Sequence, residues 1–251
     1  LVLIRMFNYL IKIEYDGTNF VGWQSQKNGI SIQEKIEKVL EKVFKSKIRI
    51  IGAGRTDKGV HANGQCANFI INSKIDDIRK FLNSINFFLK NSLISILEVK
   101  KKGLNFHCRF DAKERIYEYH IINRLGSLSI DKNKAWHIKK KIDIKLLKKG
   151  AKILEGKHDF STFRAASCSA KSPIKKINYV KIRKNKDTIF IRFSSKSFLQ
   201  NQVRSMVGSL KYLSTDKWSF DDFKKAFKSK KRLKCAPPAP ACGLYLQKVI
   251  Y

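Results

Sequence analysis

The sequence predicts an α+β protein made of two lobes in series, each with an antiparallel sheet, which meet at a central basic cleft. Three observations lead to this expectation. Both halves of the chain alternate strand-like and helix-like hydrophobic patterns in a similar order. The 53 Lys and Arg residues outnumber the 20 Asp and Glu residues, so the formal net charge is +33. Only four prolines occur, so we expect no long linker and lobes that pack against each other.

The first half begins with a strand. Residues 9–15 alternate apolar and polar side chains, and Asp16-Gly17 ends the pattern in a turn. Ser31 and Glu34 then form a capping-box pattern, Ser-x-x-Glu, which opens a helix with Ile32, Ile36, Val39, Leu40 and Val43 on its apolar face. The other expected elements are strands at 48–51, 66–71 and 94–99 and a helix at 76–89.

The second half follows the same order of elements. The expected strands are residues 115–122, 177–182, 188–193 and 243–250, and the expected helices are 143–154, 199–213 and 221–227. Two β-α-β-β-like units in series are typical of tandem RRM-like or ferredoxin-like lobes. We expect the boundary near residues 105–113, with an N-terminal lobe at 1–108 and a C-terminal lobe at 109–251.

The composition restricts the class of protein. A charge of +33 concentrates polyanions at the surface, so nucleic acid is the first expected partner, although part of the lysine excess is equally explained as solvated surface. No apolar run approaches the ~20 residues of a membrane helix, so no membrane is expected. Residues 1–4 are too short for the apolar region of a secretory signal, and Met6 is a candidate natural start.

The cysteines argue against disulfides and metal. They are five in number, scattered, and without a C-x-x-C spacing. We expect reduced thiols in the cytoplasm. His107 and Cys108 are adjacent, and nothing else pairs with them at a ligand spacing, so no metal site is expected.

Asp57 is the first candidate for chemistry. It lies between two cations, Arg55 and Lys58, in a loop with Gly54 and Gly59 at its ends. Glycines let a backbone approach a substrate closely, which suits a reactive carboxylate. An Asx turn explains the same loop without any chemistry. The two cations suit phosphates or the gap left by an extruded base.

Arg204 and Tyr117 extend this hypothesis. Arg204 lies beside the apolar face of its expected helix, where a charge needs an acidic partner, and Asp57 is one candidate. The alternative is an arginine that extends over apolar neighbours into water. Tyr117 and Tyr119 share one face of a strand, as in a base-stacking platform, although core aromatics have the same spacing.

These segments resemble the TruA family of tRNA pseudouridine synthases. The similar motifs are Gly54-Arg55-Thr56-Asp57-Lys58-Gly59-Val60-His61-Ala62, Arg115-x-Tyr117-x-Tyr119 and Val203-Arg204-x-Met206-Val207-Gly208. Tyr15-Asp16-Gly17, Gly22-Trp23-Gln24 and residues 106–110, 163–165 and 239–246 are similar too, so the likeness runs in order from about residue 9 to residue 246. The family usually has Leu-Pro where this chain has Asn86-Phe87-Phe88-Leu89.

The resemblance implies an isomerase that turns uridines 38 to 40 of the tRNA anticodon stem-loop into pseudouridine, as a cytoplasmic homodimer and with no cofactor. It implies that Asp57 is the nucleophile or general base and that Arg204 pairs with it. It further implies that Tyr117 stacks on the flipped uracil, that Arg55 fills the vacated space, and that Leu244 contacts the substrate. Two alternatives remain open: an RNA-binding protein without chemistry, and a structural protein of the ribosome.

Overall fold

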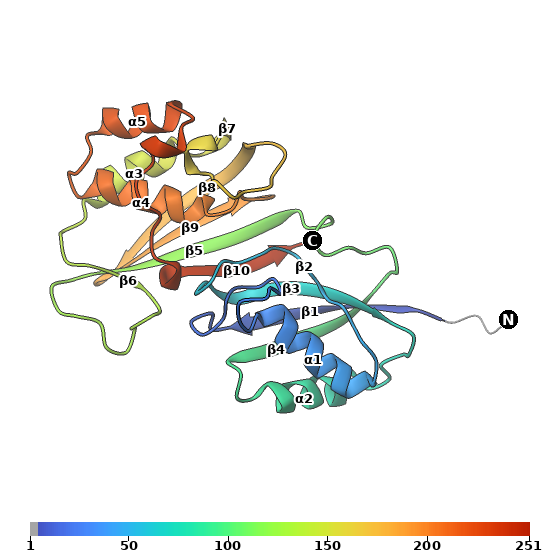
Figure 1. Ribbon diagram of the computed structural model, residues 1–251. Coiled ribbons are helices and arrows are strands. Elements are labelled where there is room, and N and C mark those ends of the chain that lie inside the picture. Colours follow the sequence, from blue (N-terminus) through green and yellow to red (C-terminus); the bar gives the residue numbers. More distant parts are fainter. Residues whose placement is uncertain (1–4) are drawn as a thin grey trace. The chain divides into compact units, whose positions relative to one another are not determined.

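The structure is a computed structural model that describes residues 5–251, so the expectation about residues 1–4 lies outside the described chain. Within that range the chain forms two compact units. The first comprises residues 5–113 and Leu246–Tyr251, and the second comprises Glu114–Tyr245. Each unit combines helices with largely antiparallel strands, so the α+β class is confirmed, but the strands form one ten-stranded mixed sheet rather than the two separate sheets that we expect from the sequence (Figure 1).

The first unit is built around strand β1. Its strands are β1 (Phe7–Tyr15), β2 (Ile51–Gly52), β3 (His61–Ile71), β4 (Ile94–Lys102) and the part of β10 (Leu244–Ile250) that starts at Leu246. β1 lies between β3 and β4 and is antiparallel to both, β10 lies beyond β3, and β2 pairs with β3. A strand paired on both sides has its backbone hydrogen bonds satisfied along its length, so β1 is the rigid axis of this unit.

Two amphipathic helices cover one face of this sheet (Figure 1). In α1 (Ile32–Phe44), the Ser31 side chain accepts a hydrogen bond from the backbone N–H of Glu34, as the capping-box pattern predicts. In α2 (Ile78–Leu89), the Asp77 side chain accepts a hydrogen bond from the backbone N–H of Lys80. Four of the five apolar residues expected to face inward from α1 are buried, and Val43 is half-buried.

An aromatic cluster joins the helices to the strands. Tyr9 of β1 stacks on Phe69 of β3 with ring centroids 5.9 Å apart. Phe81 of α2 lies 6.4 Å from Phe69 and 5.4 Å from Phe44 of α1. Aromatic side chains bury large apolar areas, so this cluster accounts for much of the packing that fixes both helices to the sheet.

The second unit contains the remaining strands of the sheet. Its strands are β5 (Glu114–Asn123), β6 (Trp136–Ile138), β7 (Gly156–Asp159), β8 (Ile174–Asn185) and β9 (Thr188–Ser195). The order is β5-β9-β8-β7 with antiparallel pairing, and β6 is parallel to β5. The long hairpin of β8 and β9 turns where the sequence predicts it, with Lys186 in the left-handed conformation.

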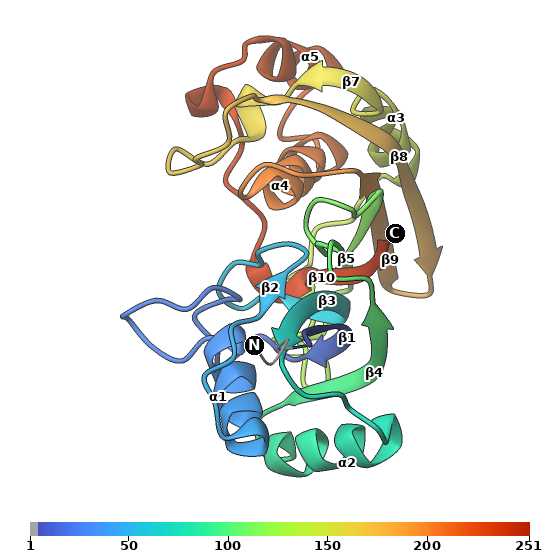
Figure 2. The ribbon, with the colours of Figure 1, turned by 90° about the vertical axis from the view of Figure 1, so that its right-hand side faces the viewer.

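Three helices pack together in the second unit: α3 (Ile144–Lys152), α4 (Gln202–Ser214) and α5 (Phe220–Lys228) (Figure 2). Asp143 caps α3, as expected, and Ser219 with Asp222 forms a capping box at α5. Gly150 lets α3 approach α4, since a Cβ atom there would lie 2.4 Å from Leu213. Short 3₁₀ turns occur at Ser161–Phe163, Arg232–Lys234 and Ala241–Gly243.

Most elements predicted from periodicity are confirmed, but three expectations need correction. The strand expected at 48–51 is reduced to Ile51–Gly52, although Ile48 and Ile50 are buried. The helix expected from residue 199 begins at Gln202, because Asn201 has the left-handed φ of 61° and cannot belong to a helix. The short strands β6 and β7 were not expected at all.

The two units divide the chain somewhat differently from the expected lobes. The change from one unit to the other falls between Lys113 and Glu114, at the edge of the expected region. The last residues, Leu246–Tyr251, belong to the first unit rather than following the second. As to the membrane, no helix among residues 5–251 is both long and apolar enough to span one.

The buried ion pair of Glu118 contributes to the stability of the second unit in a way that can be tested. Its buried carboxylate lies 2.7 Å from Arg192 Nη2 and 3.0 Å from His120 Nε2. It also accepts a hydrogen bond from Arg192 Nε at 2.8 Å. Burial favours a raised pKa, but the hydrogen bonds from His120 and Arg192 outweigh it, so the pKa of Glu118 lies below its ordinary value. A lowered pKa stabilises the fold above the unfolded value of about 4.3, and this contribution is lost as the pH falls below it.

We therefore expect Glu118→Gln to lower the free energy of unfolding by about 1–3 kcal/mol at pH 7, with the difference shrinking toward zero in acid. Urea unfolding at pH 7 and at pH 3.5 measures both values. The control is Glu98→Gln, whose carboxylate is paired but about half exposed, and which we expect to change stability little. Equal stability of Glu118→Gln and the wild type at pH 7 would contradict a net stabilising pair.

Candidate active site

Asp57 lies in the loop that connects β2 to β3, as the sequence predicts. Its side chain is half-buried, the neighbouring Thr56 is buried, and Arg55 and Lys58 are exposed. The hydroxyl groups of Thr56 and Tyr15 are 2.8 Å apart. Tyr15 is the last residue of β1, so the loop is attached, one residue before the acid, to the central strand of the first unit.

A second segment supports the loop from residues 22–23. Trp23 N–H donates to the Thr56 carbonyl oxygen at 3.0 Å. Gly22 has φ of +114°, and a Cβ atom there would lie 2.7 Å from the same oxygen. Both its backbone conformation and the close approach therefore require glycine. Tyr15 and Trp23 are themselves in contact, with ring centroids 6.2 Å apart.

Gly17 makes the tightest contact with the loop. A Cβ atom at Gly17 would lie 2.0 Å from the Val60 carbonyl oxygen, closer than real side chains come. Val60 N–H in turn donates to the carbonyl oxygen of Asp57 at 3.2 Å, which closes the turn that carries the acid. The backbone on both sides of Asp57 is thus fixed by residues 15–23.

His61 and Asp16 complete this support. Gly17 N–H donates to Nδ1 of the buried His61 at 3.1 Å. Asp16 Oδ1 also lies 3.1 Å from the same Nδ1. Asp16 Oδ1 accepts from the N–H and the hydroxyl of Thr18, at 2.9 and 2.5 Å.

The sequence predicts a turn at Asp16-Gly17 and a resemblance at Tyr15-Asp16-Gly17 and Gly22-Trp23, but it does not indicate that these residues support the Asp57 loop. The structure shows that they do. Gln65 belongs to the same set, because its Nε2 donates to the Gly54 carbonyl oxygen at 2.8 Å and fixes the start of the loop. Spacing alone gives no signal for such contacts, since residues 17 and 60 are far apart in the chain.

Arg204 lies in the first turn of α4, in the second unit. Its Nε donates to the Ala239 carbonyl oxygen at 2.8 Å, and its Nη1 donates to Asn201 Oδ1 at 3.1 Å. Its own carbonyl oxygen accepts from Ala239 N–H at 2.9 Å. One turn later, Gly208 touches the carbonyl oxygen of Pro237, which a Cβ atom would approach to 2.0 Å. Arg204 and Gly208 therefore hold residues 237–239 against α4.

The closing segment 239–244 is fixed at further points. Tyr119 OH donates to the Pro240 carbonyl oxygen at 2.7 Å, and its ring lies under Gly243, where a Cβ atom would come within 2.6 Å. Burial raises the pKa of Tyr119 well above its ordinary value, so its hydroxyl stays protonated as the donor. Leu244 follows as a buried side chain at the start of β10.

Tyr117 is the remaining candidate. It lies on the same face of β5 as Tyr119, and both side chains are buried. The ring of Phe198 meets Tyr117 edge-on, with centroids 5.3 Å apart. For Tyr119 the structure supports the interpretation as a core aromatic. A stacking role for Tyr117 stays a prediction.

The candidate residues thus fall into two groups. Asp57 and Arg55 belong to the first unit, and Arg204, Tyr117 and Leu244 belong to the second. The pairing of Asp57 with Arg204 stays a prediction. Within residues 5–251, no cluster of three or more His, Cys, Asp or Glu side chains is arranged to hold a metal ion.

Comparison with known proteins extends this picture. A family model described as tRNA pseudouridine synthase matches residues 11–111 and 151–251. Three relatives, each named tRNA pseudouridine synthase A, are similar over 98% of the chain. The one from Pelagibacter ubique is 56% identical over 246 residues and is covered over its full length. The chain belongs to the TruA family of tRNA pseudouridine synthases. The relatives from Maricaulis maris and Beijerinckia indica are 41% and 42% identical, and 98% and 94% of their lengths are covered.

Membership in the TruA family makes the support of the Asp57 loop testable. We expect Gly17→Ala to displace the Val60 carbonyl group, and with it the turn at Asp57, because the added methyl group has no room. The predicted cost is about 1–3 kcal/mol of stability and a fall of about 100-fold in kcat for pseudouridine formation, because a displacement of about 1 Å suffices for this. Thermal unfolding and a tritium-release assay on uridine-labelled tRNA measure the two effects.

The matched control is Gly126→Ala, since a Cβ atom at Gly126 meets nothing within 4 Å. We expect this variant to match the wild type in stability and in rate. A Gly17→Ala variant that is fully active would show that the position of Asp57 does not depend on this contact.

Proposed function

We propose that this chain converts uridine to pseudouridine at positions 38–40 of the tRNA anticodon stem-loop. The N1–C1′ bond of the nucleotide breaks, the base turns, and a C5–C1′ bond forms. N1 gains a proton and C5 loses one, so all atoms are conserved and no oxidant, reductant or group carrier is required. The observation that carries the proposal is the braced Asp57 loop of a TruA family chain, in which a half-buried carboxylate lies between exposed cations.

Asp57 is the proposed catalytic residue. Its half-buried position keeps the carboxylate accessible to a nucleotide, and the contacts of Thr56 and Val60 hold the backbone on either side. A carboxylate held in place acts either as a nucleophile toward C1′ or C6, or as a general base. Arg55, exposed beside it, is proposed to fill the space that the extruded uridine leaves in the stem.

The residues of the second unit are proposed to complete the site. Arg204 pairs with Asp57 in the working enzyme, Tyr117 stacks on the flipped uracil, and Leu244 contacts the base. What supports these roles is the rigid setting of Arg204, which is held by Ala239 and Asn201, and of Leu244, which follows the fixed segment 239–243.

We propose further that the two units are RRM-like synthase lobes, with the change from one to the other near residues 105–113, and that they meet at a basic cleft. The charge of +33 supports tRNA as the partner of such a cleft. The working enzyme is proposed to be a homodimer in the cytoplasm. These statements rest on resemblance to the TruA family, and sedimentation at several concentrations tests the dimer.

The decisive experiment removes the charge of Asp57. We expect Asp57→Asn to bind tRNA within about threefold of the wild type, because an amide has the same shape, and to lose pseudouridine formation by at least about 10⁴-fold, because an amide is no nucleophile or base. Filter binding measures the affinity, and tritium release from C5 measures the reaction.

The matched control is Asp76→Asn in the same unit, which removes an exposed carboxylate paired with Lys74. We expect this variant to be fully active. Normal activity in Asp57→Asn would refute the assignment of Asp57, and loss of all tRNA binding would move its role from chemistry to recognition.

A substitution at Arg204 tests the role proposed for the second unit. We expect Arg204→Lys to lower kcat about 10²-fold or more while leaving KM nearly unchanged, since a lysine has no Nε to bond Ala239 and no planar fork to hold a carboxylate. Arg183→Lys, an exposed arginine over the ring of Phe190, is the control, and we expect it to be neutral. A wild-type kcat for Arg204→Lys would mean that charge alone is sufficient at this position.

A further inference from the structure

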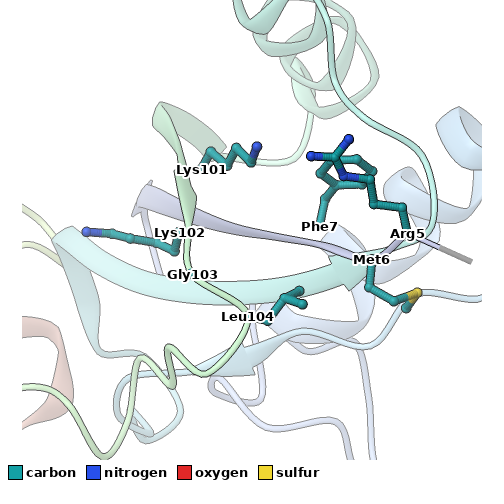
Figure 3. A pocket seen from close by; sticks show the side chains of 7 residues that line it. All are labelled: Arg5, Met6, Phe7, Lys101, Lys102, Gly103 and Leu104. Atoms are coloured by element: carbon teal, nitrogen blue, oxygen red, sulfur yellow. The ribbon is translucent and has the colours of Figure 1, made fainter. Parts of the chain in front are cut away.

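A second basic site lies in the first unit, where β1 begins and β4 ends. It is a hollow of about 420 Å³ lined by seven residues (Figure 3). The lining residues are Arg5, Met6, Phe7, Lys101, Lys102, Gly103 and Leu104. Three of the seven are cations and none is an acid. Arg5 and Lys101 lie on the face of Phe7, whereas Lys102, the next residue along β4, points to the opposite face of the sheet.

The three cations are held by aromatic rings rather than by carboxylates. Arg5 lies over one ring, with its guanidinium carbon 5.6 Å from the centre of Phe7, and Lys101 Nζ lies 5.2 Å from the same centre. Lys102 Nζ lies 5.1 Å from the ring centre of Phe106. Among residues 5–251 no ion pair involves any of the three. Cation–π contacts orient a charge without neutralising it, so these cations remain available to an anion.

One wall of the hollow is fixed by a buried asparagine. Asn8 is fully buried, and its Nδ2 donates to the carbonyl oxygens of Gly103 and Phe106, at 3.1 and 2.8 Å. Its Oδ1 accepts from Asn68 Nδ2 at 3.0 Å, and Asn68 Oδ1 accepts from Cys108 N–H at 3.1 Å. Buried polar side chains that satisfy one another rigidify the backbone around them, so the turn after β4 has its shape before any ligand binds.

We propose that this hollow binds a backbone phosphate of tRNA, as an accessory contact that rests on the function proposed above. The unneutralised charge of Arg5 and Lys101, which converge on the ring of Phe7, favours an anion. Phe7 is buried and its ring is in contact with two cations, so it offers no free face on which a base could stack. The chemistry of the site therefore selects the sugar-phosphate backbone rather than a nucleobase.

The position of the hollow determines which part of the substrate reaches it. It lies at the Phe7 end of β1, and the Asp57 loop is attached at the Tyr15 end. Eight residue steps of a strand span about 27 Å. A phosphate in the hollow therefore lies well away from the Asp57 loop, and we infer that it belongs to tRNA outside the anticodon stem-loop.

The test compares two substrates, whole tRNA and the isolated anticodon stem-loop. We expect the double variant Arg5→Ala/Lys101→Ala to lose roughly tenfold in affinity for whole tRNA in 0.1 M salt, with the slope of log K against log salt less steep by about 0.9, as for one phosphate. The affinity for the stem-loop and the kcat on both substrates should stay within twofold of the wild type. Fluorescence anisotropy titrations over 50–200 mM salt give the slopes.

The control is the double variant Lys74→Ala/Lys100→Ala. It removes the same charge from the same unit, but both of its lysines are ion-paired, with Asp76 and Glu98, and neither lines the hollow. We expect it to bind both RNAs like the wild type. If the two double variants lose affinity equally, or if the stem-loop loses as much as whole tRNA, the charges act only at long range and the proposal is wrong.

A second variant adds a charge instead of removing one. A Cβ atom at Gly103 meets nothing within 4 Å, so Gly103→Glu places a carboxylate in the hollow without disturbing the backbone. We expect a loss for whole tRNA larger than that of Arg5→Ala/Lys101→Ala, and none for Gly126→Glu, where there is also free space. Unchanged binding by Gly103→Glu would overturn the accessory contact. If Gly103→Glu binds tRNA like the wild type and the wild type forms pseudouridine, only the accessory contact is refuted and the proposed function is not affected.

Discussion

The hydrogen bond between Tyr15 and Thr56, with the glycine contacts beside it, is the interaction on which the candidate site depends. A carboxylate on a surface loop has many conformations, and holding it in one of them costs entropy. Here a central strand restricts the loop. β1 is paired on both sides, and its last residue, Tyr15, forms a hydrogen bond with Thr56, the residue before Asp57. The precision of the loop is thus a property of the sheet beneath it.

In the second unit, a helix holds the side chain of Arg204 in place. Arg204 forms hydrogen bonds to Ala239 through both its side chain and its backbone, and Gly208 allows residues 237–239 to lie directly on α4. An arginine occupied in this way has few rotamers left, so its remaining donors point in a defined direction. The same residue therefore has a structural and a proposed electrostatic role, which explains why a lysine is a poor substitute.

How far the sequence predicts this structure depends on the range of the interactions. The caps at Ser31, Asp143 and Ser219 and the alternation of β1 are local, and the structure has them where the sequence puts them. The contact of Gly17 with Val60 is not local. The left-handed φ of Asn201, which delays α4, is local, but hydrophobic periodicity does not report it. Motifs identify Asp57 as the candidate, but only the coordinates show which residues hold it.

Which cations can bind an anion also depends on contacts that the sequence alone does not show. The acids of this chain are few, and several are occupied by lysines of their own neighbourhood, such as Glu98 with Lys100 and Asp76 with Lys74. With so large an excess of cations, the number of lysines says little about where an anion binds. What distinguishes a binding site is a cation that is oriented but not neutralised. Arg5 and Lys101 meet that condition over the ring of Phe7, because the fold brings the start of β1 beside the end of β4.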